Sequence, residues 1–136
     1  MKELTFAEID SMSFHDVRVL TFHVDLDNKK LSFVTDCSFV GEGIDNYVGR
    51  TEVIIKDWDS CEIRVGDGSG QNNWTYLDQK TIKGKELREI CVSEIGRDQL
   101  LMGFNVGTGY WTEYKFINGK VEVKIEEEDP FAEQRK

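Results

Sequence analysis

The segment from Tyr110 to Ile125 carries the clearest structural signal in the chain. Apolar and polar residues alternate on both sides of the dipeptide Asn118-Gly119. Because Asn-Gly accepts the positive φ angles of a type I′ turn, this pattern predicts an antiparallel β-hairpin. The apolar faces of its two strands would consist of Tyr110, Thr112, Tyr114 and Phe116 and of Val121, Val123 and Ile125. The rest of the chain should then supply a layer that covers this apolar face.

Similar alternation recurs along most of the chain. The alternating segments cover residues 17–26, 31–39, 47–58, 61–65 and 100–106, and turns rich in Asp, Asn and Gly separate them. Thr5 and Glu8 match a capping box and predict a short helix that ends near Ser11. We therefore expect a mainly β fold, in which an antiparallel meander of about eight strands forms a sandwich or half-barrel, with a short N-terminal helix.

The segment from Lys85 to Ile95 is ambiguous. Four of its residues would share one stripe of a helix: Leu87, Ile90, Cys91 and Glu94. Ile90, Val92 and the alternating segment that follows favour a strand. We expect a strand here, with a helix as the alternative.

Length and composition fit one globular domain. The chain has 136 residues, of which 39% are hydrophobic and 32% charged, and it contains a single proline. A domain of this size buries roughly two-thirds of its unfolded surface, so it needs neither a metal nor a disulfide to fold. We expect residues 1–136 to form one β domain, with residues 126–136 as an acidic, frayed tail.

The charge balance restricts the partners that suit this chain. A formal net charge of −9 repels phosphate backbones and anionic membranes, so we expect neither nucleic acid nor membrane as a partner. A basic protein is favoured because opposite charge speeds encounter, although acidity can also serve solubility alone. The sequence has no apolar run that could cross a bilayer and no signal-peptide core, so we expect a cytoplasmic protein.

Recognisable catalytic motifs are absent from the sequence. It contains no P-loop, dinucleotide-binding, nucleophile-elbow or zinc-protease motif. His15 and Asp16 could hold a metal or act as a base, or they could simply make hydrogen bonds to the backbone where a strand begins. Cys37, Cys61 and Cys91 lack C-x-x-C spacing and should be reduced, buried thiols. We expect no enzymatic activity, no metal and no cofactor.

Three tryptophans lie next to polar residues. Trp58 stands between Asp57 and Asp59, Trp74 follows two asparagines, and Trp111 is out of phase with the apolar residues of its strand. Large aromatic side chains on a polar surface are typical of binding hot spots, although a sheet covered on both faces gives the same pattern. The predicted partner-binding residues are Asp57, Trp58, Asp59, Trp74 and Trp111.

The element Phe14-His15-Asp16 opens the first long strand of this small acidic β protein. In this respect the chain resembles the immunity proteins of bacterial polymorphic-toxin and contact-dependent growth inhibition systems. The resemblance implies a non-enzymatic protein that binds and neutralises one cognate toxin domain, for example a nuclease, and it transfers no interface residues. The alternatives are a small-molecule-binding β-barrel or an enzyme of lipocalin-like or cupin-like architecture, which an enclosed apolar cavity would favour, and a structural subunit of a larger assembly.

Overall fold

The computed structural model describes residues 2–4, 7, 9, 11–14, 16–39, 47–66, 74–77, 84–96 and 98–125. As expected, the fold is mainly β. The strands are β1 (Lys2–Glu3), β2 (Val17–Asp25), β3 (Lys30–Thr35), β4 (Ser38–Phe39), β5 (Tyr47–Val48), β6 (Thr51–Lys56), β7 (Ser60–Gly66), β8 (Trp74–Tyr76), β9 (Leu87–Glu94), β10 (Gln99–Asn105), β11 (Trp111–Ile117) and β12 (Lys120–Ile125).

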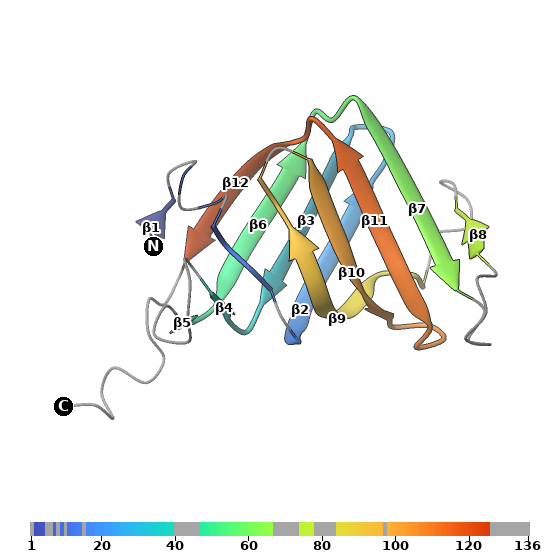
Figure 1. Ribbon diagram of the computed structural model, residues 1–136, viewed down its shortest axis with the longest axis horizontal. Coiled ribbons are helices and arrows are strands. Elements are labelled where there is room, and N and C mark those ends of the chain that lie inside the picture. Colours follow the sequence, from blue (N-terminus) through green and yellow to red (C-terminus); the bar gives the residue numbers. More distant parts are fainter. Residues whose placement is uncertain are drawn as a thin grey trace.

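Ten of these strands form one antiparallel sheet in the order β1-β12-β6-β3-β2-β9-β10-β11-β7-β8. The sheet is not closed, and β1 and β8 are its edges. Strands β4 and β5 form a separate pair. Figure 1 shows that the part of the sheet containing β12, β6 and β3 leans toward the part containing β11 and β7, and the two parts approach each other where β6 leads into β7.

The prediction that residues Asn118-Gly119 close a β-hairpin is wrong. These residues connect β11 to β12, but β11 pairs with β10 and β7, whereas β12 pairs with β6 and β1. Residues 57–59 likewise connect β6 to β7, which are not neighbours in the sheet. Since β6 pairs with β12 and β7 with β11, both connections carry one two-stranded ribbon around the same bend. We call this bend, residues 57–59 and 118–119, the corner.

The corner explains why the local sequence signal was misleading. Asn118 does have a positive φ of 55°, as its preference for turns predicted. Its side-chain Nδ2 donates a hydrogen bond to Asp59 Oδ2 at 2.8 Å, and its backbone N–H donates to Asp98 Oδ1 at 3.1 Å. A Cβ on Gly119 would overlap the side chain of Gln99. Asn-Gly therefore fits a sharp change of direction here without bringing its two flanking strands together.

The ambiguous segment is a strand, as expected, and two β-bulges account for its helix-like spacing. The pairing of β9 with β10 shifts register twice, which leaves Cys91 and Arg88 as extra residues. This insertion places the buried Leu87 and Ile90 three positions apart, which is the spacing of a helical stripe. The bulges also change the direction of the Cys91 and Arg88 side chains.

The hydrophobic core lies between the two parts of the bent sheet. The ring centroids of Phe22 and Tyr114 are 5.2 Å apart, and those of Trp58 and Phe116 are 4.6 Å apart, so aromatic rings bridge the two parts. The largest fully buried side chains are Tyr114, Phe14, Phe33, Phe116, Leu31, Ile55, Leu87, Ile90, Ile95, Leu101, Gln99 and Val17. Packed side chains therefore fill the interior that a ligand-binding barrel would keep open.

The expected N-terminal helix is not seen as an element among the described residues. Most of the segment from Thr5 to Ser11 lies outside them, although Ser11 N–H donates a hydrogen bond to the carbonyl oxygen of Ala7 at 3.3 Å. The predicted tail, residues 126–136, also lies outside the described residues. In the described part of the chain, no helix is long and apolar enough to span a membrane.

Candidate functional site

One side of the sheet formed by β9, β10, β11, β7 and β8 carries large side chains that face away from the core. The cross-strand register arranges them in three rows. The middle row contains Val92, Met102, Glu113, Arg64 and Tyr76, the aromatic row contains Phe104, Trp111 and Trp74, and the row nearest the corner contains Glu94, Leu100, Lys115 and Glu62. We call these three rows the outer face. Tyr76 and Val92 are 61% and 43% exposed.

A network of polar and aromatic contacts holds the centre of the outer face. Arg64 donates hydrogen bonds to both carboxylate oxygens of Glu113, at 3.0 and 3.3 Å, and Trp111 Nε1–H donates to Glu113 Oε2 at 3.2 Å. The guanidinium carbon of Arg64 lies 4.0 Å from the centroid of the Trp74 ring. Partial burial alone would lower the pKa of Arg64, but the hydrogen bond and charge of Glu113 raise it overall. These contacts keep a long cationic side chain in one geometry.

A shallow hollow opens beside this network. It has a volume of about 280 Å³ and is lined by Glu62, Arg64, Leu100, Glu113 and Lys115. Leu100 is the aliphatic residue of this lining, and the other four side chains carry both signs of charge. Such a hollow suits a long side chain with an aliphatic stem and a polar head.

The structure brings together only part of the predicted partner-binding set. Trp74 on β8 and Trp111 on β11 both lie in the aromatic row of the outer face, with Gly66 of β7 between them in the register. Asp57 and Asp59 are exposed, but they belong to the corner, about 20 Å from Trp111 along β11. Trp58 is 3% exposed, so its assignment to a binding surface is wrong. The corner directs this ring inward, where it packs on Phe116.

Sequence reasoning missed most of the outer face. Arg64 and Glu113 are 49 positions apart in the chain, and only the pairing of β7 with β11 makes them neighbours. Phe104 belongs to an alternating segment that the sequence does show, but alternation alone cannot say which strands lie side by side, and Tyr76 lies outside the alternating segments. The contacts of Arg64, Glu113, Trp111 and Trp74 could have been predicted only with knowledge of which strands pair.

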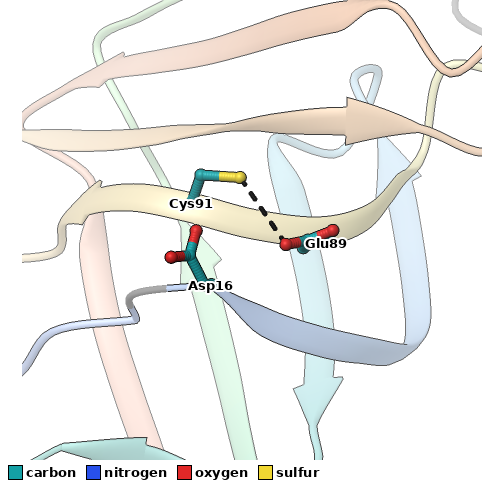
Figure 2. Close-up of side chains that lie close together, drawn as sticks. All are labelled: Asp16, Glu89 and Cys91. Atoms are coloured by element: carbon teal, nitrogen blue, oxygen red, sulfur yellow. Dashed lines mark hydrogen bonds between the residues drawn. The ribbon is translucent and has the colours of Figure 1, made fainter.

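A second cluster forms where β2 meets β9 (Figure 2). The ligand atoms of Asp16, Glu89 and Cys91 all lie within 4.8 Å of one another, and the Cys91 thiol is 3.9 Å from Glu89 Oε1. Burial and the charges of Glu89 and Asp16 raise the pKa of Cys91 to about 11. The raised pKa disfavours the thiolate, which is the nucleophilic form of cysteine. His15, the expected companion of Asp16, lies outside the described residues.

The three cysteines are free thiols, as expected, but they are half-buried rather than buried. Burial, with a contribution from Glu62, raises the pKa of Cys61 to about 12. Neither Cys61 nor Cys91 thus has the lowered pKa of a catalytic cysteine. His23, the described histidine, is exposed on β2.

No protein-family model, curated protein or solved structure matches this chain. The resemblance to immunity proteins therefore remains a prediction. Any function has to be argued from the outer face itself.

Proposed function

We propose that this chain is a non-enzymatic protein-binding module that binds its partner through the outer face. The single observation that carries the proposal is the character of this face. The solvent side of an antiparallel sheet normally carries polar residues. Here it carries the aromatic row, which contains Trp74 and Trp111, and beside it Tyr76, which remains 61% exposed. Exposed apolar groups gathered on one face mark interaction sites.

The residue types of the outer face support the same function. Trp, Tyr, Phe, Met and Arg are enriched in protein interfaces, and Trp, Tyr and Arg supply most hot spots. Arg64 is already held by Glu113 and Trp74 at 3.0 and 4.0 Å. Binding would therefore cost little additional side-chain entropy at this position.

The dimensions of the outer face also suit a protein partner. Five strands about 4.8 Å apart and three rows about 6.8 Å apart span about 20 by 14 Å. This area is smaller than the roughly 800 Å² that each partner buries in a standard interface. The outer face would form the apolar centre of such an interface, with polar residues around it as the rim.

The proposed partner is a basic protein. The net charge of −9 favours encounter with a positively charged surface. Together with the resemblance at Phe14-His15-Asp16, this leads us to propose a bacterial cytoplasmic immunity protein that neutralises a toxin domain, such as a nuclease. The small-molecule alternative is weaker because the described interior is filled with side chains, and the hollow beside Arg64 is open to solvent.

The test uses the protein encoded by the neighbouring reading frame as the candidate partner. Its affinity for wild type, Tyr76→Ala and Trp111→Ala is measured by surface-based kinetics. Each substitution should cost about 2 kcal/mol or more, chiefly through faster dissociation. Leu20→Ala is the matched control, because Leu20 is 40% exposed on β2, outside the outer face, and should change the binding free energy by less than about 0.5 kcal/mol.

Two results would contradict the proposal. One is tight binding that Tyr76→Ala and Trp111→Ala leave unchanged. The other is an equal loss for Leu20→Ala, which would place the interface elsewhere. Circular dichroism of each variant checks that the loss of affinity does not come from unfolding.

A further inference from the structure

The charged groups of the outer face are distributed unevenly. The aromatic row lies at one end of the five strands, and the row with Leu100 lies at the other end, next to the corner. Four carboxylates gather at this second end, which we call the carboxylate end: Glu62, Glu94, Asp59 and Asp98. The outer face is therefore apolar at one end and acidic at the other.

Among the described residues, carboxylates outnumber cations at the carboxylate end. No ion pair among the described residues involves Glu62 or Glu94. Asp59 and Asp98 accept hydrogen bonds from Asn118 at 2.8 and 3.1 Å, but amide donors leave the negative charge in place. Lys115 lies directly opposite Glu62 in the register of β11 and β7, so one described lysine shares this end with four carboxylates. Arg64 in the middle row is already paired with Glu113.

The solvent side of the other part of the sheet is different. Lys56 and Glu122 form an ion pair there at 2.9 Å. Glu52 lies directly opposite Lys124 in the register of β6 and β12. Lys120, Lys56 and Lys30 also lie in one row of that side, so lysines outnumber the two glutamates there. Glu52 and Glu122 serve as control carboxylates outside the outer face.

We propose that a basic protein partner docks on the outer face in one orientation. Its apolar anchor lies over the aromatic row, and its lysine or arginine side chains lie over the carboxylate end. This inference rests on the proposed function and adds the polarity of the complex. The hollow above Leu100 takes the aliphatic stem of one such side chain, so that its charged head lies between Glu62 and Glu113.

The experiment titrates the full chain with an octalysine peptide at low ionic strength and follows backbone amide shifts by NMR. The peptide carries the cationic groups of the proposed partner without an apolar anchor. Amides of Glu62, Glu94 and Asp98 should shift together, and added salt should weaken the effect. Binding of octalysine to the acidic residues 126–129 would instead shift the amides of those residues, so the two binding sites can be distinguished.

Two double variants of equal net charge make the test specific. Glu62→Gln with Glu94→Gln removes two carboxylates from the carboxylate end, and Glu52→Gln with Glu122→Gln removes two from the other part of the sheet. The affinity measured at the carboxylate end should fall roughly threefold to tenfold for the first pair. It should stay within about twofold of wild type for the second pair.

The inference is overturned if octalysine does not bind, if its shifts centre on the other part of the sheet, or if both double variants lose affinity equally. The last result would mean that net charge alone attracts cations. Failure of the proposed function would give a different experimental result. In that case Trp111→Ala would leave binding of the neighbouring-frame protein unchanged, whatever octalysine does at Glu62 and Glu94.

Discussion

The close approach of β9 and β10 at Gly103 makes a sharp stability prediction. Gly103 lies opposite Ile90, and a Cβ there would overlap the carbonyl oxygen of Glu89 and lie 3.1 Å from the Ile90 Cα. These are backbone atoms, so no rotamer change can relieve the overlap, and the two strands must move apart. Overpacking costs about 1–3 kcal/mol, and each weakened ladder hydrogen bond adds about 1 kcal/mol. We therefore expect Gly103→Ala to lower the free energy of unfolding by about 3 kcal/mol.

Urea denaturation followed by tryptophan fluorescence measures this change, and a thermal melt should show a Tm lower by about 12 °C. Gly66→Ala is the control, because a Cβ on Gly66 would meet its nearest atoms at 3.7 and 3.8 Å, which is ordinary contact. It should change stability by less than about 0.5 kcal/mol. A Gly103→Ala variant as stable as wild type would refute the register of β9 and β10.

Three further predictions concern the core, the thiols and metal dependence. Trp58→Ala should cost about 3–5 kcal/mol in urea denaturation, because it empties the space beside Phe116; a loss of partner affinity without loss of stability would contradict the buried position of Trp58. The folded pKa of Cys61 is about 12 and its ordinary value is 9.0, so stability should fall as pH rises above 9 toward 12, and Cys61→Ala should make the decline less steep. A chelator should leave the Tm unchanged, because a domain of this size can fold without a metal; a drop in Tm that zinc reverses would refute this.

The alternating period of several long strands was visible in the sequence. The alternation around Tyr114 and Phe116 correctly predicted which residues of β11 face the core, and it placed Trp111 on the opposite side. Val123 and Ile125 are buried in β12, also as expected. Alternation succeeds here because it depends only on the local geometry of one strand.

Strand neighbours and changes of phase were not visible. Asn118-Gly119 signals a reversal of direction, but whether its flanking strands pair depends on the distant strands β6 and β7. In β2, a register shift between Val19 and Thr21 leaves Leu20 40% exposed, although simple alternation grouped it with Phe22. A single bulge moves every later side chain to the other face.

The candidate site shows the same division between local and long-range information. Trp74 and Trp111 could be singled out because each is a large ring at a polar position. Trp58 had the same local signature, between two carboxylates, but the corner buries it. The ion pair of Arg64 and Glu113 depends on strand pairing across 49 positions, so no local sequence pattern predicts it.

A photocrosslinking experiment tests most directly whether the outer face is the binding surface. The photoreactive amino acid p-benzoylphenylalanine replaces Tyr76 in one variant and Leu20 in another, and each is irradiated with the neighbouring-frame protein. Both positions are exposed, at 61% and 40%, but only Tyr76 belongs to the outer face. The account predicts a covalent adduct from position 76 that Trp111→Ala reduces, and none from position 20. An adduct from position 20 alone would contradict it.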